Sequence, residues 1–274
     1  MKRLTALFFV LIIFFSLCSC GKKSGNDPEN TGNTYADDFP PPVKYKTENK
    51  DYSEEFKDEE GNVIARLEIS YPVVSSKDRP DAAEEITQWF EEYKDSEADS
   101  IRMNLDSLKE RNRKFGIEGV TVTRIAVEPY YQGGYHVSYT IKKQSGTNPD
   151  EDDGGLTGCT FSLADGYRLS LKALYKSEAE NPREEIKRLI QEEADVSYSV
   201  RGNIALSEEQ KKILDDLFDD ESFCIKENTI YFPYSFKTLS SGARTGFYLC
   251  PIDFDYAEDV LITPEEYYEQ NYKD

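Results

Sequence analysis

The thiol of Cys20 is the side chain whose chemistry the sequence specifies most clearly. The segment Leu17-Cys18-Ser19-Cys20 has the pattern of a bacterial lipobox: a branched apolar residue, two further positions ending in a small residue, and then a cysteine. In such a motif the thiol takes a diacylglyceryl group, fatty acyl chains such as palmitate are added, and the cysteine becomes the first residue. We therefore predict lipidation at Cys20, and the alternative is an ordinary secretory signal with chance cysteines.

The residues before this motif fit a signal peptide. Lys2 and Arg3 supply a positive start, and residues 4–17 form a predominantly apolar run. This run is too short, with these flanks, to serve as a permanent transmembrane helix. We expect residues 1–19 to be a lipoprotein signal peptide and the protein to be extracytoplasmic, anchored to the cell membrane or outer membrane by two or three acyl chains on one residue.

His136 is the only histidine in the chain. Multi-histidine zinc sites are therefore excluded, and Ser-His-Asp catalysis would depend wholly on this residue. It follows Gly133-Gly134-Tyr135, where two glycines permit a tight turn or bulge. We regard Gly133, Gly134 and His136 as a candidate motif in which the histidine either fixes the turn, the reading we favour, or faces a partner.

Other recognisable chemistry is lacking at the level of motifs. The sequence contains no H-E-x-x-H, G-x-S-x-G, Walker A or G-x-G-x-x-G pattern. With 53 Asp and Glu residues, some carboxylate pairs would lie close together in any fold, so such pairs cannot identify a glycosidase. The sequence predicts a protein that is not an enzyme and has no cofactor and no metal site.

The charge balance limits the partners. The chain has a formal net charge of −20, and removal of Lys2 and Arg3 with the signal peptide would make it −22. Such a charge argues against binding nucleic acid and against direct docking on anionic headgroups. It would attract cationic partners, although plain solubility is the simpler explanation.

Three cysteines, Cys159, Cys224 and Cys250, remain besides Cys20 after processing. Outside the cytoplasm two of them could pair and leave one over. Cys224 with Cys250 is the preferred pair because both lie in strand-like segments of one region. Three buried free thiols are an equal alternative.

The pattern of apolar residues places these groups on an ordered domain. Residues 20–50 are polar and rich in Gly, Asn, Asp and Pro, which favours a flexible tether, and order is expected from Tyr52. Alternation predicts strands at 63–71, 120–127, 135–141, 157–163, 167–171, 223–225, 230–236 and 247–252. Helical spacing or start signals predict helices from 78 to 108, with a break considered at 95–99, and from Asn181-Pro182, Ser207 and Thr263.

This order of elements indicates an α+β fold. We expect a mixed or antiparallel sheet with a long N-terminal helix and further packed helices. An N-terminal strand-helix-strand half over residues 51–145 and a C-terminal half over 146–274 should form one compact unit.

The segment Tyr130-Tyr131-Gln132-Gly133-Gly134-Tyr135-His136 resembles the Tyr-x-x-Gly-Gly-x-His stretch of the RsiV/PdaC-like extracytoplasmic domain family. That family was long labelled a domain of unknown function, contains a lysozyme receptor and has many lipoprotein members. Further resemblances, in the family's order, are Leu67 to Pro72, the helix from Asp81 with Ile86 and Trp89, Phe161 to Tyr175, and Ile230 to Tyr234. Together the resemblance covers about residues 60 to 262.

The resemblance implies a function but transfers no catalytic residue. Tyr135 stands where the family usually has a small residue, Val137 where it has Gly, and the 239–246 stretch departs from the family's loop. We see no anti-sigma segment and no deacetylase domain, so those activities are not expected. The resemblance suggests a non-enzymatic envelope-binding lipoprotein for lysozyme-like cationic proteins or cell-wall glycan. The alternatives are an envelope hydrolase acting on glycan or peptide through His136, and a structural scaffold in an envelope complex.

Overall fold

The structure is a computed structural model that describes residues 44–149, 154–200, 206–235 and 247–272. The chain separates into two units, residues 1–39 and 40–274, and every described element belongs to the second. The signal peptide, Cys20 and residues 20–43 of the predicted tether lie outside the described residues. Within the described ranges, no helix has the length and apolar character needed to cross a membrane.

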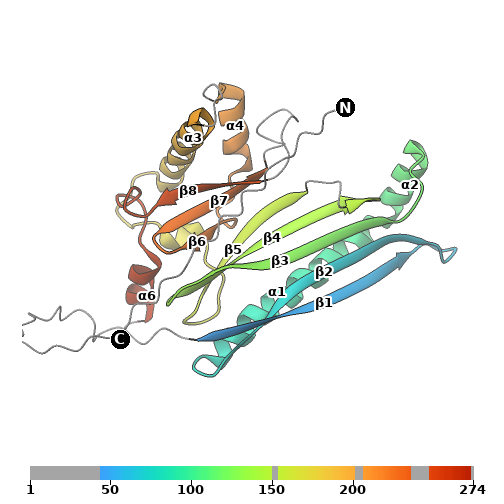
Figure 1. Cartoon of the computed structure of the whole chain (residues 1–274), viewed down its shortest axis with the longest axis horizontal. Coiled ribbons are helices and arrows are strands. Elements are labelled where there is room, and N and C mark those ends of the chain that lie inside the picture. Colours follow the sequence, from blue (N-terminus) through green and yellow to red (C-terminus); the bar gives the residue numbers. More distant parts are fainter. Residues whose placement is uncertain (1–43, 150–153, 201–205, 236–246, 273–274) are drawn as a thin grey trace, which may run out of the picture. The chain divides into compact units, whose positions relative to one another are not determined.

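The first part of the domain is a five-stranded sheet in the order β1-β2-β3-β4-β5 (Figure 1). Its strands are β1 Tyr45–Lys57, β2 Val63–Ser76, β3 Thr121–Gln132, β4 His136–Gly146 and β5 Gly155–Ser162. Only β2 and β3 run parallel, and all other neighbours are antiparallel. A parallel pair needs a long crossover, which helices α1 (Pro80–Met103) and α2 (Leu105–Phe115) supply. The predicted α+β class and mixed sheet are confirmed.

Helix α1 lies along one face of this sheet (Figure 1). Its apolar stripe includes the fully buried Ile86 and Phe90, and it continues through the buried Ala98 and Ile101. The helix is therefore unbroken across residues 95–99, where a break had been considered. The break falls at Asn104, between α1 and α2.

The second part is a three-stranded antiparallel sheet with its own core. The strands are β6 Cys224–Lys226, β7 Thr229–Ser235 and β8 Phe247–Asp253, and the helices are α3 Pro182–Val200, α4 Glu208–Leu217 and α6 Pro264–Tyr272, with the 3-10 helix η2 Leu171–Leu174. One apolar cluster ends at Leu163 and the other begins at Leu169. β5 pairs with β4 and therefore belongs to the first sheet, whereas the predicted division of the domain at 145/146 stays a prediction.

The two sheets are packed into one unit through close backbone contact. A Cβ atom placed on Gly158 of β5 would lie 2.5 Å from the carbonyl carbon of Phe223, next to β6. Glycine is required where two backbones approach this closely. The loop that precedes β6 is consequently held against β5.

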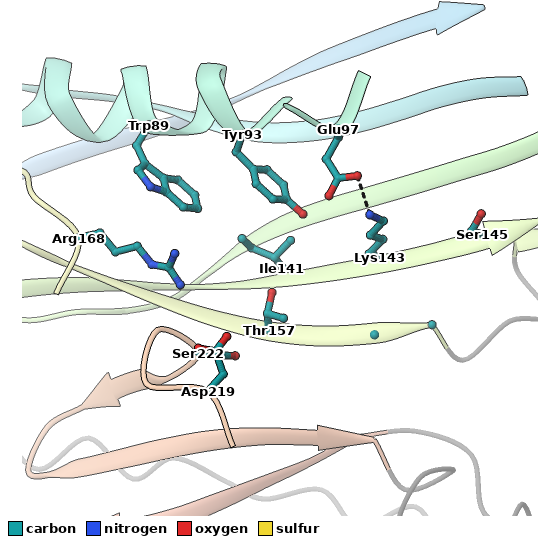
Figure 2. Close-up of a pocket in the computed structure, with 12 residues that line it drawn as sticks. Trp89, Tyr93, Glu97, Ile141, Lys143, Ser145, Thr157, Arg168, Asp219 and Ser222 are labelled. Atoms are coloured by element: carbon teal, nitrogen blue, oxygen red, sulfur yellow. Dashed lines mark hydrogen bonds and ion pairs between the residues drawn. The ribbon is translucent and has the colours of Figure 1, made fainter. Parts of the chain in front are cut away.

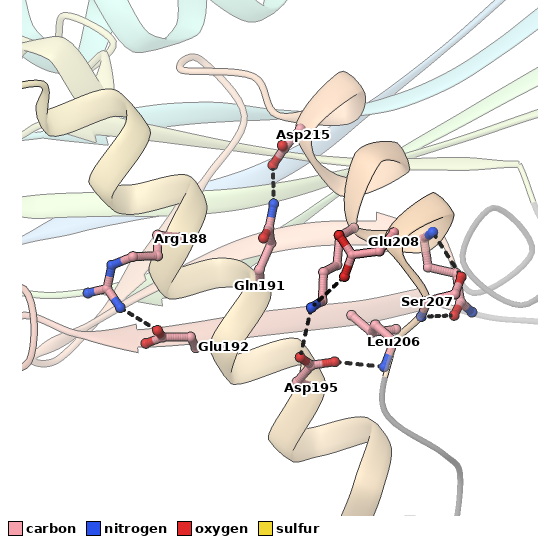
Figure 3. Close-up of polar contacts among 10 residues, drawn as sticks. Arg188, Gln191, Glu192, Asp195, Leu206, Ser207, Glu208 and Asp215 are labelled. Atoms are coloured by element: carbon pink, nitrogen blue, oxygen red, sulfur yellow. Dashed lines mark hydrogen bonds and ion pairs between the residues drawn. The ribbon is translucent and has the colours of Figure 1, made fainter.

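Two of the three predicted helix starts carry the expected caps. Ser207 and Gln210 form a reciprocal capping box at the start of α4 (Figure 3). Thr263 and Glu266 bond each other's backbone amides in the same way at α6, at 3.1 and 2.7 Å. Helix α3 begins after Asn181 as predicted, but Asn181 adopts a left-handed φ of 53°.

Side chains of α3 contact α4 and the segment that leads into it (Figure 3). Gln191 donates to the Asp215 carboxylate at 2.7 Å, and Asp195 accepts the amide N–H of Leu206, also at 2.7 Å. These contacts join the two helices that cover the second core.

The first strand begins before Tyr52, where order was expected, and the strand predicted at 167–171 is wrong. β1 starts at Tyr45, inside the predicted tether, and the Tyr45 hydroxyl donates to the carbonyl oxygen of Leu163 at 2.8 Å. Because β1 is an edge strand with few buried residues, its sequence is mostly polar and lacks the apolar alternation that would predict a strand. The strand predicted at 167–171 reduces to a single bridge between Phe161 and Arg168, followed by η2.

The three described cysteines are buried and free. Cys224 pairs in register with Tyr231, whereas Cys250 pairs with Phe232. Adjacent residues of β7 point to opposite faces, so Cys224 and Cys250 lie on opposite faces of the sheet and cannot bond. The alternative of three buried free thiols is the one that the structure shows.

Candidate ligand-binding groove

The Gly133-Gly134-Tyr135-His136 motif forms the turn between β3 and β4. The amide of Gly133 donates to the carbonyl oxygen of His136 at 2.9 Å. A Cβ on Gly133 would lie 2.9 Å from the Tyr131 ring and 3.3 Å from the His136 ring. The glycine is thus needed for close packing of two rings on the turn, which is a structural role.

The His136 side chain is 5% exposed and does not line the groove described below. Neither ring nitrogen has a hydrogen-bond partner among the described residues. Burial lowers the pKa of His136 to about 4, and the neighbouring backbone of Ile225 acts weakly in the opposite direction. The imidazole is therefore neutral at pH 7.

A cavity of about 580 Å³ lies between α1, the β4–β5 edge and the loop before β6 (Figure 2). We call it the groove. It brings together residues from five separate parts of the chain: Trp89, Tyr93, Glu97, Ile141, Lys143, Ser145, Gly154, Gly155, Thr157, Arg168, Asp219 and Ser222.

One wall of the groove is a row of side chains on α1. Trp89, Tyr93 and Glu97 are spaced four residues apart and therefore project from the same face of the helix. Figure 2 shows all three pointing from α1 toward β4. They lie beside the buried stripe of the helix, which leaves them half-buried rather than enclosed in the core.

The floor is the part of the sheet that these side chains face. Ile141, Lys143 and Ser145 alternate along β4 and therefore share one face, and Thr157 of β5 is the register partner of Ile141. Asp219 and Ser222 complete the opposite side from the loop before β6 (Figure 2).

The aromatic part of the groove is rigidly supported. The rings of Trp89 and Tyr93 are parallel within 3°, with centroids 5.6 Å apart. The edges of Phe90 and Phe161 hold Trp89 from the core side, at 5.0 and 5.3 Å between ring centroids. Burial, helped by the charge of Glu97, raises the pKa of the Tyr93 hydroxyl, which stays protonated and can donate a hydrogen bond.

Charged groups flank these rings. The Lys143 ammonium pairs with Glu97 at 2.6 Å. The guanidinium carbon of Arg168 lies 5.1 Å from the centre of the Trp89 ring, and Arg168 also donates to the carbonyl oxygen of Glu221. Asp219 accepts the amide N–H of Glu221 at 2.9 Å, which fixes the turn beside the groove.

None of the groove residues was singled out as a site from the sequence. Gly133, Gly134 and His136 do not line it, and Trp89 was assigned only to the helix. One available signal was the chain's single tryptophan, which stands four residues before Tyr93 and next to the buried Phe90. The partners on β4, β5 and the 219–222 loop give no such local signal.

Comparison with known proteins supports the fold. No protein-family model matches the chain, and no curated protein matches it. The crystal structure of a DUF3298 family member from Bacteroides fragilis is similar with a TM-score of 0.53 and 14% identity, covering 85% of this chain and 100% of that one. A DUF3298 family protein from Pseudomonas aeruginosa has a TM-score of 0.50 and 10% identity, covering 81% of this chain and 97% of that one.

These structural neighbours share the fold of the present chain. At such low identity the likeness carries no residue roles. The resemblance to the RsiV/PdaC-like family remains a prediction.

Proposed function

We propose that this chain is a non-enzymatic binding lipoprotein of the cell envelope and that its groove binds cell-wall glycan. The observation that carries the proposal is the parallel pair of Trp89 and Tyr93, which lines an open cavity beside hydroxyl and charged side chains. The lipobox at Cys20 supports the envelope location, and the DUF3298 neighbours are compatible with it.

The chemistry of the groove suits sugar rings. A pyranose ring presents C–H groups on its faces, which pack on the electron-rich faces of aromatic rings, and hydroxyls at its edge, which bond polar side chains. Thr157 and Ser222 supply hydroxyls opposite the aromatic pair. The row from Trp89 to Glu97 spans about 12 Å at the rise of an α-helix, which gives room for more than one sugar ring.

The polar groups favour holding a ligand over cleaving it. His136, on which a histidine-dependent hydrolase would rely, is buried, neutral and absent from the groove lining. Glu97 is committed to an ion pair with Lys143. These features support binding as the role of the groove.

The test is calorimetric binding of soluble, peptide-free cell-wall glycan fragments to the domain without its lipid. We expect Trp89→Leu and Tyr93→Leu to weaken binding about tenfold or more, because each removes a stacking surface. Tyr167→Leu is the matched control, since Tyr167 is 61% exposed and lies outside the groove lining.

The two parts of the proposal fail separately. Absence of glycan binding by the wild-type domain, or equal binding by all three variants, contradicts the assignment of the groove. Release of new reducing ends from the fragments on long incubation contradicts the non-enzymatic role.

A lysozyme-like cationic protein is the second candidate ligand, and the net charge of −20 favours it. Opposite charges raise the association rate, most strongly at low salt. Binding of the domain to lysozyme should therefore weaken as salt rises from low to physiological concentration. Lack of binding at both concentrations removes this candidate.

A further inference from the structure

Arg168 is a cation of the groove that has no carboxylate partner among the described residues. The chain has 53 acidic and 33 basic residues. Arg66, Arg102 and Arg188, for example, each form an ion pair. No ion pair to Arg168 is found among the described residues, although its side chain lies half-buried in the groove.

The guanidinium is held in place but is not fully bonded. It lies over the Trp89 ring and donates to the carbonyl oxygen of Glu221, while its Nε atom is buried without a hydrogen-bond partner. A buried donor without a partner costs free energy, and more so on a charged group. Figure 2 shows the Arg168 side chain reaching into the groove beneath Trp89.

The other charges of the groove do not balance Arg168. The Lys143 ammonium is already neutralised by Glu97 at 2.6 Å. Asp219, the remaining carboxylate, is exposed, accepts the amide of Glu221 and forms no ion pair with Arg168. The groove therefore contains a positive charge, held next to an aromatic surface, that no described carboxylate pairs with.

We propose that Arg168 is an anion-binding anchor and that the ligand of the groove carries a carboxylate beside the sugar ring that packs on Trp89 and Tyr93. This inference rests on the proposed function and specifies its ligand class as an acidic glycan. A carboxylate would balance the charge of Arg168, since guanidinium and carboxylate groups match in geometry. In cell-wall glycan this carboxylate belongs to the lactyl ether of alternate sugars or to an attached peptide.

Four probes separate these sources: a neutral N-acetylglucosamine tetramer, a peptide-free fragment that retains lactyl carboxylates, the same fragment with its carboxyl groups reduced to alcohols, and the stem peptide alone. We expect the wild-type domain to bind the carboxylate fragment about tenfold more tightly than its reduced form, as one charged hydrogen-bonded contact would give. Arg168→Gln should abolish that preference while still binding the neutral sugars.

Two further variants control for charge and for folding. Arg102→Gln makes the same charge change outside the groove lining, at a guanidinium that lies 5.5 Å from the centre of the Phe56 ring. This variant should keep the preference for the carboxylate fragment over its reduced form. Arg168→Lys keeps the charge but lacks the planar, two-pronged donor group of a guanidinium, so it should retain only part of the preference for the carboxylate fragment. The lysine variant decides the question if Arg168→Gln does not fold.

The outcomes distinguish this inference from the proposed function. Equal wild-type affinity for the carboxylate and reduced fragments overturns the role of Arg168 and leaves glycan binding standing. Binding of none of the sugar probes overturns the proposed function. If the domain binds only the stem peptide, and Arg168→Gln loses this binding, the role of Arg168 as an anion anchor is supported and glycan as the ligand is contradicted.

Discussion

The hydroxyl of Ser138 donates a hydrogen bond to the carbonyl oxygen of Ile225 and accepts one from the amide N–H of the same residue, each at 2.9 Å. Ser138 belongs to β4 of the first sheet and Ile225 to β6 of the second. β6 pairs with β7 on one side only. The Ser138 side chain thus takes the place of a neighbouring strand for Ile225 at the free edge of β6. Two further bonds hold the preceding loop at the groove: Thr160 donates to the carbonyl oxygen of Phe223, and Ser222 accepts the amide N–H of Gly158, each at 3.2 Å.

Replacing Ser138 by Ala should destabilise the domain by about 3 kcal/mol, because it leaves a buried donor and a buried acceptor of Ile225 without partners. Urea denaturation of the wild type and the variant measures this difference. Ser53→Ala on the exposed side of β1 is the control and should change the free energy of unfolding by less than about 0.5 kcal/mol. Equal stability of the two variants would mean that the bonds to Ile225 are dispensable.

The stability of the domain should fall between pH 6.5 and pH 4 because of His136. Its folded-state pKa of about 4 is below the ordinary value of 6.5, so in this range the unfolded chain binds a proton that the folded protein excludes. The contribution is complete above pH 6.5, and about 3 kcal/mol is lost as the pH falls to 4.

Comparison with His136→Phe isolates this effect from the titration of carboxylates. Unfolding free energies measured from pH 7 to 5 should fall more steeply for the wild type than for the variant, because carboxylates contribute equally to both. Parallel curves for the two proteins would show that His136 is not buried in its neutral form.

The elements that could be predicted from the sequence are those encoded by neighbouring residues. The Ser207–Gln210 and Thr263–Glu266 boxes are local hydrogen-bond pairs, and both helices begin where these pairs predict. The start of β1 was missed because most of its residues are polar and exposed and because its anchor, the bond from Tyr45 to Leu163, joins residues 118 positions apart.

The groove could not be predicted for the same reason. Trp89, Lys143 and Ser222 are far apart in the chain and meet only when α1 crosses the sheet and β6 docks on β4. The Gly133-Gly134 turn, in contrast, could be recognised in the sequence because its cause is local. The rings of Tyr131 and His136 crowd the position that a Cβ on Gly133 would take. The two glycines of this turn are therefore explained by close packing, and they do not mark the position of the groove.

The thiols of Cys159, Cys224 and Cys250 should be unreactive in the folded protein. Burial raises the pKa of Cys224 and of Cys250 to about 12 and raises that of Cys159 as well, so almost no thiolate is present at neutral pH. Mass spectrometry after alkylation should find three modified cysteines in urea and none under native conditions, using a Cys20→Ala domain without its signal peptide. Rapid native labelling, or a mass two hydrogens lower that indicates a disulfide, would contradict the buried free thiols.

Lipidation at Cys20 is predicted from the motif and is open to a direct test in cells. Cys20→Ala removes the thiol that would take the diacylglyceryl group, so the variant should no longer incorporate labelled palmitate and should be released or remain unprocessed. Cys18→Ala is the matched control, because it lies in the same motif and keeps Cys20, and it should remain labelled and bound to membranes. Since stable anchoring needs the acyl chains, a Cys20→Ala protein that still carries labelled lipid would exclude this residue as the anchor.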